Sequence, residues 1–211
     1  MEFDYLRLGR ELLSLLTILS PFSVLPVYVT LTTGISEHER ERSLRKTLLT
    51  VLVTLLFFQW TGLFLFRAIG VALPSFQIAG GLIIASVAWS MLHASPSRTQ
   101  MTPHEDEEAL VREDFAIVPL AIPMLAGPGA ITTVILLSQQ RPTAPGAFLL
   151  AGLIVLSVAL LYPAFRLAQP LFNKLGVSGT RVVTRVMGMV LLALAVEFVV
   201  QGIVRVLSGL R

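Results

Sequence analysis

The sequence predicts an all-α polytopic membrane protein with six transmembrane helices in a 3+3 inverted repeat. Of its 211 residues, 55% are hydrophobic and 14% are charged, whereas a soluble domain carries about 25% charged residues. Several separate apolar runs reach the roughly 18–25 residues that a helix needs to cross a bilayer. In each half of the chain, prolines also interrupt the first apolar run at the same spacing, which predicts that the two halves are related.

The six predicted spans are separated mostly by short connections. The first three cover about residues 11–33, 46–66 and 76–93, and the last three cover about 115–138, 146–165 and 181–206. The long polar stretch between them contains the acidic run from Glu105 to Glu108 and is predicted to be a linker. We therefore expect a first three-helix repeat over 1–93, a polar cytoplasmic linker over 94–114 and a second, inverted repeat over 115–211.

The first and fourth spans are predicted to be broken helices. Pro21 and Pro26 interrupt one, and Pro123 and Pro128 interrupt the other, with an offset of 102 residues in both cases. A proline removes one backbone donor and clashes with the carbonyl four residues earlier. At membrane depth, such irregular backbone is tolerated only where protein or a water-filled cavity surrounds it. Interruptions at matching places in two halves are the best sequence indication of a transporter's binding site.

The chemistry of these interruptions suits a zwitterion. Free N–H groups near Gly127 and Gly129 could receive a carboxylate, and freed carbonyls could receive an ammonium group or a cation. The alternative is that the glycines only permit close helix packing and the prolines only kink the helices. The hydroxyls of the serines and threonines near these interruptions could form hydrogen bonds with a ligand or with a carbonyl of their own helix. The candidate substrate-binding residues are Ser20, Pro21, Ser23, Pro26, Pro123, Ala126, Gly127, Pro128, Gly129 and Thr132.

Glu197 is a carboxylate well inside the sixth predicted span, roughly 13 Å from its end at 1.5 Å per residue. An ionisable group at that depth is a functional-site hypothesis, and Glu197 is the candidate residue for coupling proton movement to transport. The alternative is a glutamate that pairs with a helix-end group or reaches toward the membrane surface. Sodium ions and protons are the candidate coupling ions. No cofactor or metal is expected, because the chain has no cysteine and its three histidines lack metal-site spacing.

The distribution of Lys and Arg predicts the orientation in the membrane. Six of the sixteen lie on the side of the chain ends and ten on the opposite side. This excess places the first, third and fifth loops in the cytoplasm and both termini in the periplasm. The formal charge of +3 does not indicate a nucleic-acid partner. The expected partners are the lipid bilayer and a small solute, and no oligomeric state is predicted.

Several short motifs are spread over nearly the whole chain. They are Pro21-x4-Pro26 with Thr30 to Thr33, Gln77-Ile78-Ala79-Gly80-Gly81, Pro119 to Pro123, Ala126 to Ile131, Arg185-x-x-Gly188 and Phe198-x3-Gly202-Ile203. In these motifs the sequence resembles the MarC family of bacterial inner-membrane proteins, which includes small neutral amino acid transporters. The resemblance implies six helices, an inverted repeat and a bacterial inner-membrane location.

Four positions depart from that family pattern. Ser20 stands where the family usually has Asn or Asp, and Ser23 stands where it has Gly. Gln77 replaces a usual arginine, and Glu197 replaces a usual glutamine. These changes bear on the solute and the coupling ion rather than on the fold. A role in antibiotic resistance is not carried over.

The expected function is transport of small neutral amino acids by alternating access around the two broken helices, as the resemblance implies. The alternatives are an exporter of another small solute, a channel-like pore and a non-transporting membrane protein. An enzyme is not expected, because the sequence shows no nucleophile and base pair and no metal cluster. The direction of transport is not predicted.

Overall fold

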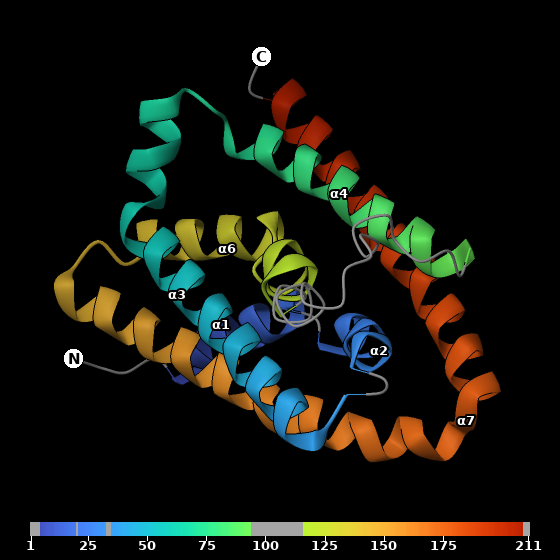
Figure 1. Cartoon of the computed structure of the whole chain (residues 1–211). Coiled ribbons are helices and arrows are strands. Elements are labelled where there is room, and N and C mark those ends of the chain that lie inside the picture. The colour runs from blue at the N-terminus through green and yellow to red at the C-terminus, as the bar shows by residue number, and fades with distance from the viewer. Residues whose placement is uncertain (1–4, 20, 33–34, 94–115, 209–211) are drawn as a thin grey trace, which may run out of the picture.

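The computed structural model describes residues 5–19, 21–32, 35–93 and 116–208, and these ranges contain helices and no strand. The all-α prediction is confirmed for them, whereas the predicted linker 94–114 lies outside the described residues. In chain order, the helical segments are α1 (Tyr5–Leu19), α2 (Pro21–Leu31), α3 (Glu37–Ile69), α4 (Leu73–His93), η2 (Ala116–Leu125), α6 (Pro128–Gln139) and α7 (Ala144–Ser208). Figure 1 shows how they cross one another.

Four helical stretches in the described ranges are long and apolar enough to cross a membrane. They are Glu37–Ile69, Leu73–His93, Ala144–Leu167 and Val182–Ser208, and they coincide with four of the predicted spans. The helix α6 is apolar but shorter, with 12 residues. It lies within the predicted fourth span.

The fifth and sixth predicted spans form one continuous helical run. We expected the helix to stop near Phe165 and to begin again near Arg181, but α7 extends from Ala144 to Ser208 with Pro163 and Pro170 inside it. A proline removes one helical hydrogen bond and bends the helix without having to end it. Figure 1 shows α7 turning sharply, so that its C-terminal part returns alongside α4.

The helix α3 begins about three turns before the predicted span because of a capping box. The Ser36 side chain accepts a hydrogen bond from the Glu39 N–H, and the Glu39 carboxylate accepts one from the Ser36 N–H. The helix ends at Gly70, which has φ 74° in the left-handed region. Its 33 residues correspond to about 50 Å, more than the roughly 30 Å of a bilayer's hydrocarbon core. The charged first turns up to Lys46 therefore extend beyond the apolar part.

Glycines allow α4 and the C-terminal part of α7 to pack closely as an antiparallel pair. A methyl group added at Gly81 would lie 2.9 Å from the carbonyl oxygen of Ala195, and one added at Gly202 would lie 2.5 Å from Cγ1 of Ile78. At the other end of the pair, Gly188 faces Met91. Small residues at such crossings let helix backbones approach each other in membranes. This pair holds Gln77 and the C-terminal part of α7 in contact.

Candidate functional site

The end of α1 meets the beginning of α6. A methyl group added at Gly129 would lie 3.2 Å from Cδ1 of Ile18 and 2.8 Å from Cζ of Phe198. Ile18 is in the last turn of α1, which ends one residue before Ser20. The chain is also non-helical at Ala126 and Gly127, between η2 and α6. The structure therefore brings together two chain segments that the prolines singled out, from opposite halves of the sequence.

The turn before α6 requires glycine. The segment η2 is a π-helix whose last bond runs from the Ala126 N–H to the Ala121 carbonyl at 2.7 Å. Gly127 follows in an extended conformation. A Cβ there would overlap the carbonyl oxygen of Pro123, and a Cβ at Gly80 on α4 would overlap the Pro128 ring. Glycine is thus required at both positions because neighbouring atoms lie too close for a Cβ, and not because φ is unusual.

The first turn of α6 offers backbone donors. Gly127 is its N-cap and makes no side-chain cap hydrogen bond, and Pro128 at the next position has no N–H. The N–H groups of Gly129 and Ala130 precede the first possible intrahelical bonds of this helix. The positive end of the helix dipole lies at the same place. This arrangement favours an anionic group.

Thr132 is buried one turn into α6, and its hydroxyl has no hydrogen-bond partner. Its side chain is 4% exposed, and its Oγ1 atom is one of two unpartnered buried side-chain atoms among the described residues. Other threonines behave differently, because Thr47 and Thr61 each donate to the carbonyl four residues earlier, at 2.9 and 2.7 Å. The expected alternative, a bond to its own helix, is therefore not made by Thr132. A buried hydroxyl without a partner is a group that a ligand could satisfy.

A chain of polar side chains connects α4 to α7 beside this turn. Gln77 is 3% exposed and lies one helical turn before Gly80. Its amide donates to Gln201 at 3.4 Å and accepts from Arg205 at 3.3 Å. Gln201 in turn donates to Glu197 at 2.7 Å. Gln77 and Glu197 were both singled out from the sequence, but the connection between them was not predicted.

Glu197 lies on the exposed side of α7 rather than among the glycines. Its carboxylate accepts a hydrogen bond from Gln201 on the same helix. The neighbouring Phe198 is the residue that reaches Gly129 and Gly81. The position of Glu197 inside a candidate membrane span agrees with the sequence analysis, and its coupling role stays a prediction.

The structure describes only some of the remaining predicted site residues. Ser20 lies outside the described residues, and so do the side chains of Ser23 and Pro26. Pro21 begins α2 and is half-buried, as is Pro123 in η2, whereas Ala126 is fully buried. Because Pro26 lies inside α2 while its counterpart Pro128 begins α6, the two interruptions differ in local structure.

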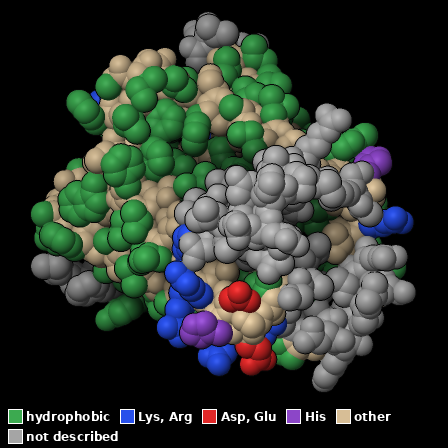
Figure 2. Space-filling model, in the orientation of Figure 1, with side chains coloured by type: hydrophobic (Ala, Val, Ile, Leu, Met, Phe, Trp, Pro, Cys, Tyr) green, Lys and Arg blue, Asp and Glu red, His purple; other side chains and the backbone are tan. Residues whose placement is uncertain are grey.

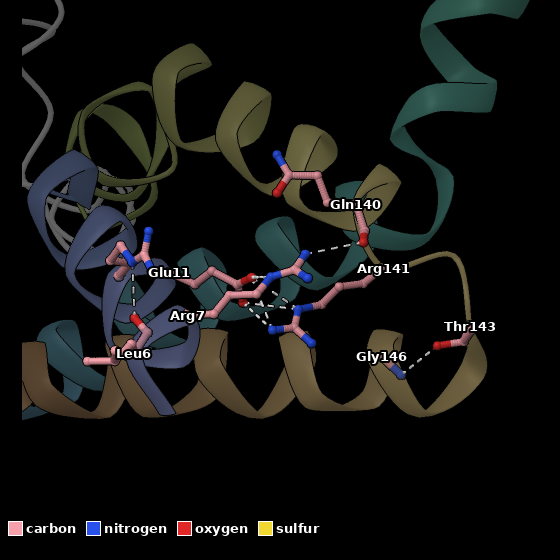
Figure 3. Close-up of polar contacts among 8 residues, drawn as sticks. Leu6, Arg7, Glu11, Gln140, Arg141, Thr143 and Gly146 are labelled. Carbon is pink, nitrogen blue, oxygen red and sulfur yellow. Dashed lines mark hydrogen bonds and ion pairs between the residues drawn. The ribbon is translucent and has the colours of Figure 1, made fainter. Parts of the chain in front are cut away.

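A buried ion pair lies near the beginning of α1 and was not predicted. Figure 3 shows the Glu11 carboxylate between the side chains of Arg7 and Arg141. The Arg141 Nη2 to Glu11 Oε2 distance is 2.9 Å, and these side chains are 13% and 7% exposed. Arg7 adds a contact of 3.1 Å but is 46% exposed. The pair connects α1 to the turn between α6 and α7, and no local signal indicates contact between residues so distant in sequence.

A cavity of about 410 Å³ lies between α2, the start of α3 and the middle of α7. Figure 2 shows charged side chains gathering over the start of α3, whereas most of the described surface in that view is hydrophobic. None of these residues was predicted to line a binding site. The cavity is lined by Tyr28, Glu37, Arg40, Glu41, Leu44, Arg45, Phe165, Arg166 and Pro170.

Hydrogen bonds order the charged side of this cavity. The Tyr162 hydroxyl donates to Glu41 Oε1 at 2.6 Å, and Arg45 Nε donates to the same oxygen at 2.8 Å. The Tyr162 hydrogen bond is the largest cause of a lowered pKa of the Glu41 carboxyl, followed by that of Arg45 and the nearby positive charges. Glu41 lies in the charged first turns of α3, beyond its apolar part.

These features define a multi-pass integral membrane protein. Its helices are long and apolar, glycines let them pack closely, and polar side chains on them form hydrogen bonds with one another. The chain belongs to the MarC family: the profile described as "MarC family integral membrane protein" matches residues 6–207. The sequence-based resemblance to this family is confirmed.

Relatives in distant organisms are similar over nearly their full length. A UPF0056 membrane protein of Aquifex aeolicus is 36% identical over 94% of this chain and 93% of the relative. A UPF0056 membrane protein of Methanocaldococcus jannaschii is 33% identical over 96% of this chain and 98% of the relative. The UPF0056 membrane protein YhcE of Escherichia coli is 31% identical over 99% of this chain and 97% of the relative. No solved structure matches the chain significantly.

Proposed function

We propose that this protein transports small neutral amino acids by alternating access, with the solute bound where the end of α1 meets the beginning of α6. The contact of Ile18 with Gly129 carries this proposal, because it places segments from both halves of the chain at one point. Transporter sites of this kind lie between repeats, where interrupted helices offer backbone groups to the solute.

The groups at this point match a zwitterion. The N–H groups at the start of α6 would receive the carboxylate, and the hydroxyl of Thr132, which has no partner, would supply a further hydrogen bond. Carbonyls at the end of α1 lie at the negative end of that helix dipole and would receive the ammonium group. Gly129 leaves little space, which favours solutes with small side chains.

The architecture that goes with this function has six spans as a 3+3 inverted repeat. In it, α1 with α2, and η2 with α6, are the two broken helices, and α7 provides the last two spans. The chain would lie in a bacterial inner membrane with both termini in the periplasm, as the Lys and Arg distribution predicts. A sodium ion or a proton would be the coupling ion, with Glu197 as the proton-coupling candidate.

Uptake of labelled glycine, alanine and serine into liposomes tests the transport proposal. The purified protein is reconstituted, and sodium and proton gradients are imposed in separate experiments. Saturable uptake of at least one solute is expected. Conductance without saturation would indicate a channel-like pore instead. If none of the three solutes moves under either gradient, the amino acid assignment is wrong.

Substitution of Gly129 by Ala locates the site. The three atoms nearest to the added methyl group belong to the ends of the Ile18 and Phe198 side chains and to no backbone, so these side chains can shift while the helices keep their packing and the space for solute shrinks. We expect uptake to fall by about tenfold, which corresponds to about 1.4 kcal/mol. The matched control is Gly152→Ala on α7, where an added methyl group meets nothing within 4 Å. Equal uptake by both variants would exclude Gly129 from the site.

A further inference from the structure

The cavity at the start of α3 is lined by none of the residues at the two interruptions. Its volume of about 410 Å³ falls within the roughly 300–1,000 Å³ range of small-molecule sites. The proposed transport function gives this cavity no role. Its lining therefore calls for a separate explanation.

The cavity has an excess of positive charge. Three guanidinium groups line it, from Arg40, Arg45 and Arg166, against the two carboxylates of Glu37 and Glu41. Glu41 is already engaged by Tyr162 and Arg45 through one oxygen. The Glu37 side chain is 95% exposed and contacts Arg40 at 3.4 Å. An exposed pair of this kind neutralises little charge.

Arg166 is oriented without a carboxylate. Its Nη1 donates to the Tyr162 hydroxyl at 3.2 Å, and its guanidinium carbon lies 5.9 Å from the centre of the Tyr162 ring. In the part of the chain that the structure describes, no Asp or Glu forms an ion pair with it. A guanidinium has five N–H donors, so this contact leaves four for another acceptor. Tyr162 donates its single hydrogen to Glu41 and accepts from Arg166, which makes it a positioning residue.

Buried apolar side chains lie behind these cations. Phe165 is fully buried and packs edge-to-face against Tyr28, with 5.1 Å between ring centres. Leu44 is 1% exposed. Beside low-dielectric surface, a guanidinium attracts an anion more strongly than it does in open water. Such a site suits an anionic group.

We propose that this cavity binds an oxyanion, either a carboxylate or a phosphate, through Arg40 and Arg166. A small soluble acid and an anionic lipid headgroup both present this chemistry. The proposal does not depend on transport, because binding at equilibrium requires neither a gradient nor flux.

Equilibrium binding to the full chain in phosphatidylcholine nanodiscs tests the proposal. The probes are radiolabelled alanine, inorganic phosphate and spin-labelled phosphatidylglycerol. Arg166→Gln should weaken binding about 10- to 100-fold, as expected for loss of a charged hydrogen bond. Tyr162→Phe should weaken binding less, because the Arg166 guanidinium is retained and loses only the hydrogen bond that orients it. The matched control is Arg67→Gln, at the exposed opposite end of α3, which should bind as wild type.

The probes distinguish the source of the oxyanion. Alanine that competes with phosphate supports a soluble acid, whereas binding of phosphatidylglycerol alone supports a lipid headgroup. If no probe binds the wild type, or if Arg166→Gln and Arg40→Gln both bind as wild type, the proposal is overturned. Alanine binding that survives Arg166→Gln but is lost in Thr132→Val would belong to the transport site and not to the cavity. Phosphate binding then decides the cavity proposal, so the two proposals can fail separately.

Discussion

Glu11 on α1 and Arg141 in the turn between α6 and α7 form a buried ion pair, with 2.9 Å between Oε2 and Nη2. Arg141 Nε also donates to Glu11 Oε2 at 3.0 Å, so the contact is multiply hydrogen-bonded. The pair joins the beginning of the chain to the C-terminal end of α6. It therefore restrains the relative position of the two helices that meet at Ile18 and Gly129.

Substitutions in this ion pair should differ in their effect on stability. Glu11→Gln leaves Arg141 buried without its carboxylate and should lower the free energy of unfolding by about 3 kcal/mol. Arg141→Gln should cost less, because Arg7 still pairs with Glu11. Glu37→Gln, in an exposed pair, should change it by less than about 0.5 kcal/mol. Unfolding in detergent measures these values, and equal losses for Glu11→Gln and Glu37→Gln would contradict the pairing.

Close packing of α4 on α6 should make Gly80 intolerant of a methyl group. In Gly80→Ala, the new Cβ would overlap the Pro128 ring, and α4 would have to move away. We expect a loss of about 1–3 kcal/mol in the free energy of unfolding. Gly152→Ala is the control, and it should be neutral or slightly stabilising, because alanine favours helix and nothing obstructs it. Similar stabilities of the two variants would show that α4 does not approach Pro128 closely.

Local features of the structure were predictable from the sequence, whereas contacts between distant segments were not. Pro128 has no N–H and Gly127 has no Cβ, so their local chemistry predicted an interruption inside an apolar run. Long apolar stretches likewise predicted six spans, and four of these coincide with helices that are long and apolar enough to cross a membrane. The contact between Glu11 and Arg141 was not predictable, since it depends on how distant helices pack. The continuity of α7 was missed because the fifth and sixth apolar runs were predicted as separate spans, whereas one helix with Pro163 and Pro170 inside it covers both.

Replacement of the Thr132 hydroxyl should separate stability from function. Thr132→Val removes a buried hydroxyl that has no partner, so the free energy of unfolding should rise by about 1 kcal/mol. If the hydroxyl binds solute, uptake should nevertheless fall by about tenfold. Thr61→Val is the control, because Thr61 donates to its own helix carbonyl. A more stable variant with wild-type uptake would remove Thr132 from the site.

Loss of the Tyr162 hydroxyl should alter the pH dependence of stability. Its hydrogen bond is the largest cause of the lowered pKa of Glu41. A carboxyl whose pKa is lowered on folding contributes stability above its unfolded value, 4.5, and loses it as pH falls through the folded value. Tyr162→Phe should therefore be less stable than wild type near pH 7, and the difference should shrink toward about pH 3.

Unfolding in detergent across this pH range measures the difference. In a Glu41→Gln background, the effect of Tyr162→Phe should become independent of pH, because the titrating group is absent. The stability difference between Tyr162→Phe and wild type could also stay the same at low pH although Glu41 is present. That result would show that Tyr162 does not affect stability through the pKa of Glu41.

Glu197→Gln tests whether the carboxylate on α7 carries a proton during transport. Glutamine keeps an oxygen that can accept from Gln201, where the present distance is 2.7 Å, so the free energy of unfolding should change by less than about 1 kcal/mol. The variant loses the ability to take up and release a proton. We therefore expect liposome uptake to stop responding to an imposed proton gradient, while Glu37→Gln responds as wild type. An unchanged response would exclude Glu197 as the coupling residue, and uptake driven by a sodium gradient would then be the remaining form of coupling to examine.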